Sequence, residues 1–260
     1  MNATRVALLL VLVILTSCET KPKPVSRAAA AHREATKPRW SVARGAKPRA
    51  LRVVATSGFV ESARSERGAF AARSPNDGVR FVGTDRKAAK ISIAAGSAEQ
   101  IPLADLVAEL SAQEGAMLHH NPAIKKAASS GRVAEEKRNV TVEGWVHFAK
   151  KETDNDYHVI LGSTDDPSKG VLMNVEVSGL PPHNSAAFQR LSGARRAFED
   201  AFLDALESGS KYTQFEPVQV RITGSVFFDI DHAAGKVGPD GFRPRTAWEI
   251  HGVTKIVFAN

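Results

Sequence analysis

The chain has 260 residues and a formal net charge of +7. Its single cysteine, Cys18, excludes a disulfide bond within the chain. Residues 21–52 contain ten Lys or Arg and one acid, a charge of +9, so residues 53–260 carry a net charge of −2. This distribution excludes a strongly basic folded domain.

The N-terminus carries the pattern of an export signal. Arg5 precedes an unbroken apolar run from Val6 to Leu15, which is too short to span a bilayer as a helix. The next residues, Leu15-Thr16-Ser17-Cys18, resemble the lipobox of bacterial lipoproteins. The resemblance implies a signal peptide of residues 1–17, a lipid on Cys18 and a bacterial cell-envelope location with the membrane as a partner. The residue after the cysteine is Glu19 and not the Asp that many inner-membrane lipoproteins have there, so the resemblance favours the outer membrane. A secreted protein with an incidental cysteine is the alternative.

Residues 18–52 are predicted to form a lipidated, basic, disordered tether. Apart from the positive charge, the stretch is rich in Ala and Pro and has few large apolar residues, so it buries too little surface to offset the entropy of ordering. Beside a membrane, such an arm would lie against anionic head groups. A solvated spacer is the alternative.

Residues 53–134 are predicted to form a small α+β module. Short apolar runs separated by turn residues indicate strands at residues 53–60, 79–82 and 91–95. Leu103, Leu106, Val107 and Leu110 then share one face of a helix that begins after Pro102 and ends at the sequence H-H-N-P, residues 119–122. The two adjacent histidines point in different directions on a helix, which favours a capping role over a metal site. Polar residues 129–138 mark the boundary to the next domain.

Residues 135–260 are predicted to be mainly β, with one embedded helix. Alternation places Val140, Val142, Val146 and Phe148 on one face of a strand over residues 139–148. Further strands are predicted at residues 157–162, 172–177, 218–228 and 248–258, with a helix at residues 185–207 between the third and fourth. The order β-β-β-α-β-β resembles the OB-fold, a five-stranded barrel with a helix between strands three and four. A β-sandwich is the structural alternative.

Two segments of this domain also resemble a group of bacterial proteins without an assigned activity. These are V-R-I-T-G-S-V-F-F-D-I-D-H, residues 220–232, and W-E-I-H-G-V, residues 248–253. The group has a similar F-F-D…H stretch and a closing E-x-H-x-V strand. The resemblance implies a shared fold and no known chemistry.

The OB resemblance implies a ligand-binding face on the outer side of the strands. The period of two predicts which side chains are exposed there: Glu143, Trp145, His147, Asn174, Glu176, Arg221, Phe227, Glu249 and His251. With two aromatic side chains among mixed polar groups and more Glu than Arg, this face suits a saccharide or a peptide better than a nucleic acid. Packing of Trp145 and Phe227 against the N-terminal module is the alternative.

A second group of side chains could bind a divalent metal ion. In the OB resemblance, the loop before the second strand and the loop after the fourth flank one cleft, which would bring together Asp154, Asp156, His158, Asp229, Asp231 and His232. Their spacing matches no defined metal motif, and Asp is an ordinary turn residue, so a plain turn is the alternative.

The sequence shows neither a nucleophile elbow nor a phosphate-binding glycine loop. The leading hypothesis is therefore a non-catalytic binding or scaffold lipoprotein without a cofactor, whose ligand is an envelope polymer or protein. The alternatives are a metal-dependent envelope hydrolase that uses the acidic loops, and an OB-type nucleic-acid binder.

Overall fold

The computed structural model describes residues 40–41, 50–54, 79–206, 211–232 and 235–259. The expected signal peptide, Cys18 and most of the expected tether lie outside the described residues. Within the described part, no helix combines the length and hydropathy needed to cross a bilayer.

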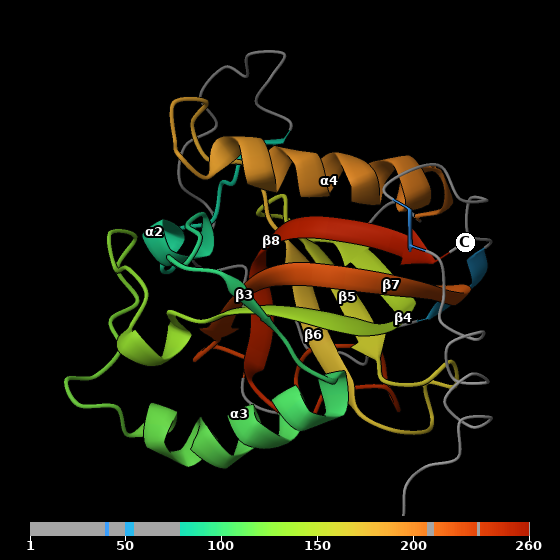
Figure 1. Cartoon of the computed structure of the whole chain (residues 1–260), viewed down its shortest axis with the longest axis horizontal. Coiled ribbons are helices and arrows are strands. Elements are labelled where there is room, and N and C mark those ends of the chain that lie inside the picture. The colour runs from blue at the N-terminus through green and yellow to red at the C-terminus, as the bar shows by residue number, and fades with distance from the viewer. Residues whose placement is uncertain (1–39, 42–49, 55–78, 207–210, 233–234, 260) are drawn as a thin grey trace, which may run out of the picture. The chain divides into compact units, whose positions relative to one another are not determined.

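The described chain is mainly β, with one mixed sheet and a few helices (Figure 1). The strands of the sheet are β1 (Trp40–Ser41), β2 (Ala50–Val54), β3 (Ala98–Gln100), β4 (Asn139–Lys151), β5 (Tyr157–Gly162), β6 (Leu172–Val177), β7 (Tyr212–Phe228) and β8 (Trp248–Ala259). The helices are α2 (Lys87–Lys90), α3 (Leu103–Leu118) and α4 (Phe188–Phe202), with 3₁₀ turns η2 (Ala134–Glu136) and η3 (Leu203–Ala205).

The pairing of the five long strands forms a cycle. Antiparallel pairs join β4 to β5, β5 to β6, β7 to β8 and β4 to β7. Strand β8 also pairs with β6 in parallel, so the pairings from β4 through β5, β6, β8 and β7 lead back to β4. Three short strands extend the sheet: β1 pairs with β8, β2 with β7, and β3 with β4.

The strand count of five was therefore wrong for the sheet as a whole, because the described residues contribute eight strands to it. Strands β1 and β3 were not predicted. The predicted strands at residues 79–82 and 91–95 are not strands: Arg80 makes an isolated bridge with Leu180, and residues 91–95 form turns and irregular backbone. Phe81 and Ala94 in these segments are buried while Val79 and Val82 are exposed, so the apolar runs contain single buried side chains without pairing as strands.

One core joins both predicted modules. Val140 of β4 and Val175 of β6 are completely buried, as alternation predicts, and α3 adds Leu106 to the same cluster of apolar side chains. Helix α4 adds Phe198, whose ring centroid lies 4.9 Å from that of Tyr157 in β5. The domain boundary near residue 134 stays a prediction, although residues on both sides of it pack into this core.

The direction of one side chain in β4 was predicted wrongly. The register of β4 against both β5 and β7 shifts between Val146 and Phe148, which indicates a bulge at His147. A bulge adds a residue and reverses the alternation beyond it. Ala149 therefore joins the main core in place of Phe148, which packs in a separate cluster with Ile160 and Tyr212.

The two long helices begin and end close to their predicted limits. Helix α3 starts directly after Pro102, as predicted, and its buried side chains include Leu106 and Leu110. Helix α4 begins three residues later than predicted, at Phe188, because residues 182–188 form two successive turns. The Ser185 amide donates to the Pro182 carbonyl at 2.9 Å, and the Phe188 amide donates to the Ser185 carbonyl at 3.0 Å.

Candidate functional site

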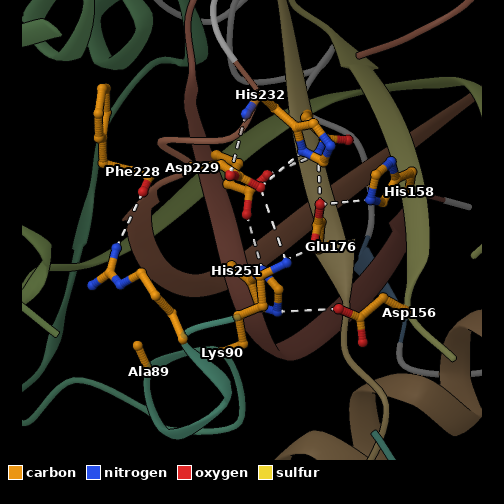
Figure 2. Close-up of polar contacts among 12 residues, drawn as sticks. Ala89, Lys90, Asp156, His158, Glu176, Phe228, Asp229, His232 and His251 are labelled. Atoms are coloured by element: carbon orange, nitrogen blue, oxygen red, sulfur yellow. Dashed lines mark hydrogen bonds and ion pairs between the residues drawn. The ribbon is translucent and has the colours of Figure 1, made fainter. Parts of the chain in front are cut away.

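Buried carboxylates and imidazoles gather on the outer side of the sheet, where β5, β6 and β8 meet the end of β7 (Figure 2). The acid–imidazole cluster, as we call it, comprises Lys90, Asp156, His158, Glu176, Asp229, His232, Glu249 and His251. Alternation produces this placement. Glu176 lies between the core residues Val175 and Val177, so it points away from the core, and Glu249 and His251 flank the core residue Ile250 in the same way.

Glu176 is at the centre of the cluster and is fully buried. Its Oε1 lies 2.7 Å from His158 Nε2 and accepts a 3.0 Å hydrogen bond from the Asn174 amide. Its Oε2 lies 2.8 Å from His251 Nδ1. On the far side of its ring, His158 Nδ1 lies 3.0 Å from Glu152 Oε1. One carboxylate thus holds two imidazoles in fixed orientations.

His251 connects Glu176 to two further acids. Its Nδ1 lies 2.9 Å from Glu249 Oε1, and its Nε2 lies 3.4 Å from Asp156 Oδ2. The other Asp156 oxygen accepts a hydrogen bond from the Gly179 amide, which fixes the carboxylate at the start of β5. His251, Asp156 and Glu176 are all 0% exposed.

Asp229 and His232 form the other side of the cluster, directly after β7. His232 Nδ1 lies 2.8 Å from Asp229 Oδ2, and Asp229 Oδ1 accepts hydrogen bonds from the amides of Asp231 and His232. The ammonium of Lys90 in α2 lies 4.0 Å from Asp229 Oδ2. Figure 2 shows Lys90 reaching toward Asp229 beside His251.

Neighbouring acids keep the two central imidazoles charged. Burial alone would lower the pKa of His251, but the Glu176 carboxylate, with help from Glu249 and Asp156, raises it to about 10. Burial opposes the charge of His158 as well, and the Glu152 and Glu176 carboxylates raise its pKa to about 9.

The carboxyl groups are affected in opposite directions. Burial raises the pKa of Glu249 to about 7, and burial together with the Asp154 charge raises that of Asp156 well above its usual value. The pKa values of Glu176 and Asp229 are lowered despite burial, because imidazoles contact both carboxylates directly. The site therefore combines acids that keep their charge with acids that favour the neutral form.

Several buried polar atoms here have an ion-pair contact without hydrogen-bond geometry to the described residues, or no hydrogen bond to them. Asp156 Oδ2 and His251 Nε2 face each other at 3.4 Å, Glu176 Oε2 faces His251 Nδ1 at 2.8 Å, Asp229 Oδ2 faces His232 Nδ1 at 2.8 Å, and Asn174 Oδ1 makes no hydrogen bond to a described residue. Most buried polar atoms in folded proteins are hydrogen-bonded, so a concentration of such atoms in one place calls for an explanation.

The same residues form two sets of possible metal ligands. Asp156, Glu176 and His251 make one set, and Glu176, Asp229 and His232 make the other; within each set, one ligand atom from every residue lies within 4.8 Å of the others. The two sets share Glu176. Carboxylate oxygen and imidazole nitrogen together suit zinc and similar divalent transition metals.

The segment before β4 covers the cluster and is fixed to the sheet by two arginines. Arg86 forms a two-pronged ion pair with the fully buried Glu136 of the same segment, at 2.7 and 2.6 Å, and donates to the Phe228 carbonyl oxygen of β7 at 3.2 Å. Arg132 donates to the carbonyl oxygens of Ser92 at 3.1 Å and His251 at 2.9 Å. These bonds hold α2, and with it Lys90, against the outer face of β8.

Only some residues of the predicted metal site belong to the two ligand sets. Asp156, Asp229 and His232 belong to the two ligand sets, and His158 contacts Glu176 from the side. Asp154 is half-buried, and its Oδ1 accepts from the Asp156 amide. Asp231 is exposed and pairs with Lys126.

The predicted ligand face is not an exposed face as a whole, and that expectation was wrong. The side chains of this set that are buried are His147, Asn174, Glu176, Phe227, Glu249 and His251. The segment before β4 covers most of them. His147 turns toward the loop after β5, where its Nε2 lies 2.9 Å from the Thr164 carbonyl oxygen. Glu143, Trp145 and Arg221 remain partly exposed.

Of these three, Arg221 lines an open hollow of about 390 Å³ on the outer face of β3, β4, β7 and β8. Cross-strand pairing forms a polar row through it, made of Gln100, Thr141, Thr223 and Lys255. Arg221, in the next row, contributes to the lining and pairs with Glu143 at 2.6 Å.

The sequence predicted neither the position of Lys90 beside Asp229 nor the covering of the site by the segment before β4. Residues 91–95 were assigned to a strand, and no local pattern places Lys90 beside Asp229, which is remote in the chain. Glu176, Glu249 and His251 were singled out, but for the exposed face.

A scan of protein-family models, a search of curated proteins and a search of solved structures found no match for this chain. Functional interpretation therefore depends on the geometry of the cluster and the hollow.

Proposed function

We propose that this chain is a non-catalytic envelope lipoprotein whose OB-like barrel contains a buried divalent metal ion and presents its outer face to an envelope polymer or protein. The observation that carries the proposal is the acid–imidazole cluster, in which two sets of ligands share Glu176.

We propose an OB-like barrel as the fold of β4–β8. It is supported by the cycle of pairings through β4, β5, β6, β8 and β7, with β6 parallel to β8 and α4 between β6 and β7. In this reading β4–β8 are the five barrel strands, and β1–β3 extend their edges.

Charge balance in the cluster depends on protons that a divalent ion could replace. Asp156, Glu176, Asp229 and Glu249 are at most 4% exposed, whereas the Lys90 side chain is the permanent cation that the described residues place beside them. Buried charges are costly unless they are compensated. Compensation comes from protons on imidazoles and carboxyl groups in the metal-free state, and a divalent ion would supply it in their place.

The geometry supports a metal ion at the first ligand set in particular. Ligand atoms bound to one tetrahedral zinc ion lie about 3.4 Å apart. One atom each from Asp156, Glu176 and His251 lies within 4.8 Å of the others, so these side chains would have to approach one another by at most about 1.4 Å. Each of them has a buried atom whose contact is an ion pair without hydrogen-bond geometry. Glu249, 2.9 Å from His251 Nδ1, would orient the imidazole, as carboxylates commonly do for metal-bound histidines.

Burial favours a structural metal ion over a hydrolytic one. A catalytic metal keeps a position open for water and substrate. The first ligand set is 0% exposed, and the segment carrying α2 lies over it. The alternative of a metal-dependent hydrolase therefore requires this segment to move away, which the arginine contacts oppose.

Metal binding is the direct test. The full chain, stripped with EDTA, is dialysed against zinc, manganese, calcium or magnesium, and the bound metal is measured by elemental analysis. We expect saturable binding of zinc or manganese that Glu176→Gln reduces at least about tenfold, because metal affinity depends on deprotonated ligands. Glu216→Gln, which removes the charge of an exposed Glu in β7, is the matched control and should bind like the unmodified chain.

Asp156→Asn, with Asp200→Asn on the exposed face of α4 as its control, repeats the test if Glu176→Gln does not fold. No saturable binding by the unmodified chain, or equal binding by folded Glu176 or Asp156 variants, would show that the cluster is an ion-pair network without a metal ion.

A further inference from the structure

Lys90 occupies a place in the cluster that resembles a cation-binding position. Its ammonium lies 4.0 Å from Asp229 Oδ2, and its side chain is 13% exposed. The same Asp229 oxygen contacts His232 Nδ1 at 2.8 Å. Asp229 Oδ2 is therefore approached by two positively chargeable groups.

The second ligand set has the composition of a metal site. Glu176, Asp229 and His232 meet the same distance condition as the first set, and they also offer two carboxylates and an imidazole. The difference between the two sets is Lys90, whose ammonium lies beside Asp229. Two ligand sets that share a carboxylate are the arrangement of a two-metal centre.

We infer that the Glu176–Asp229–His232 set is a second cation site, and that the ammonium of Lys90 takes the place of a second divalent ion there. A metal ion bound to Asp229 would lie close to this ammonium, and the two cations would repel each other in a poorly solvated interior. Lys90 therefore limits the cluster to one metal ion, held by Asp156, Glu176 and His251. This inference rests on the proposed function, because it assumes that the first set binds metal.

The test is the number of zinc ions bound per chain when Lys90 is replaced. In Lys90→Met the side chain keeps its length and loses its charge, and we expect stoichiometry to rise from one zinc ion to two. Lys87→Met is the matched control, because Lys87 lies on the same short helix and contributes to neither ligand set. It should bind as the unmodified chain does.

A thermal measurement keeps the inference testable if Lys90→Met is unstable without metal. A second zinc ion would replace the missing positive charge, so zinc should raise the Tm of Lys90→Met more than that of the unmodified chain or of Lys87→Met. A lysine needed only for packing would not be rescued in this way.

The outcomes separate the two proposals. If the unmodified chain binds no metal, the proposed function fails, whatever Lys90→Met does. If the unmodified chain binds one zinc ion and Lys90→Met also binds one, without an additional rise in Tm, the inference about Lys90 is wrong and the proposed function stands. Two zinc ions on the unmodified chain would also overturn the inference.

Discussion

His251 illustrates how one buried side chain couples the cluster to pH. Its imidazole contacts Glu176 and Glu249 and lies 3.4 Å from Asp156, and it faces no solvent. Its pKa in the folded chain, about 10, is above the ordinary value of 6.5, so folding binds a proton that the unfolded chain releases more readily.

We therefore expect the metal-free chain to lose stability as pH rises from 7 to 10. The contribution of His251 is complete below pH 6.5 and is lost as pH passes through 10; His158, with a pKa of about 9, acts in the same direction. The free energy of unfolding, measured with urea in EDTA, should fall in this window by up to about 1.4 kcal/mol per pH unit for each of these two imidazoles. His251→Gln should flatten the curve, whereas His183→Gln, an exposed histidine, should not. A flat curve for the unmodified chain would contradict the contacts assigned to His251.

At the scale of elements, the sequence predicts what alternation and helical periodicity control. Strands β5 and β6 match their predicted limits, and α3 begins where Pro102 places it. The bulge at His147 was not predictable, because one extra residue changes no local composition. Alternation also correctly separated Glu176 and His251 from the core side. It could not show that this outer face is covered, since the covering segment comes from an earlier part of the chain. Asp156, Asp229 and His232 were found because the loop before β5 and the loop after β7 were expected to converge, and Lys90 was not found.

The outer face of β3, β4, β7 and β8 is the part of the sheet that we expect to contact an envelope polymer. Its hollow offers hydroxyl, amide and cationic groups, and Trp145 is partly exposed further along β4, a combination suited to a saccharide that carries carboxylates. Using peptidoglycan sacculi as the probe, we expect the full chain to sediment with them. Combined replacement of Trp145 and Arg221 by Ala should weaken binding at least about tenfold, because Trp and Arg commonly dominate binding energy.

Combined replacement of Arg196 and Leu203 by Ala is the matched control, because both side chains are exposed at α4 and η3, away from the hollow. Equal sedimentation of both double variants would exclude the hollow as the contact, and no sedimentation of the full chain would exclude peptidoglycan as the polymer.

In the proposed whole molecule, a folded part of low net charge follows a strongly basic stretch and a cysteine that carries a lipid. Residues 53–260 carry a net charge of −2, and residues 21–52 carry +9. A single lipid chain gives marginal membrane binding, and a basic stretch next to it strengthens the attachment to anionic lipids.

Replacement of Cys18 by Ser should move the protein from the membrane fraction to the soluble fraction of the envelope, because the acyl chains are lost. The readouts are incorporation of a labelled fatty acid and fractionation of the outer and inner membranes. Ser17→Ala keeps a small residue before the cysteine and is the matched control. A Cys18→Ser protein that stays in the membrane fraction would contradict the lipoprotein assignment.

The burial of the first ligand set also has a consequence for the time course of metal uptake. Its ligands come from the start of β5, from β6 and from β8, so the site does not exist until the chain has folded, and the segment with α2 then closes over it. Exchange of a bound ion would be limited by the rate at which that segment opens. For a chain that crosses the inner membrane before it folds, the metal would be selected by the ions present in the envelope and then retained.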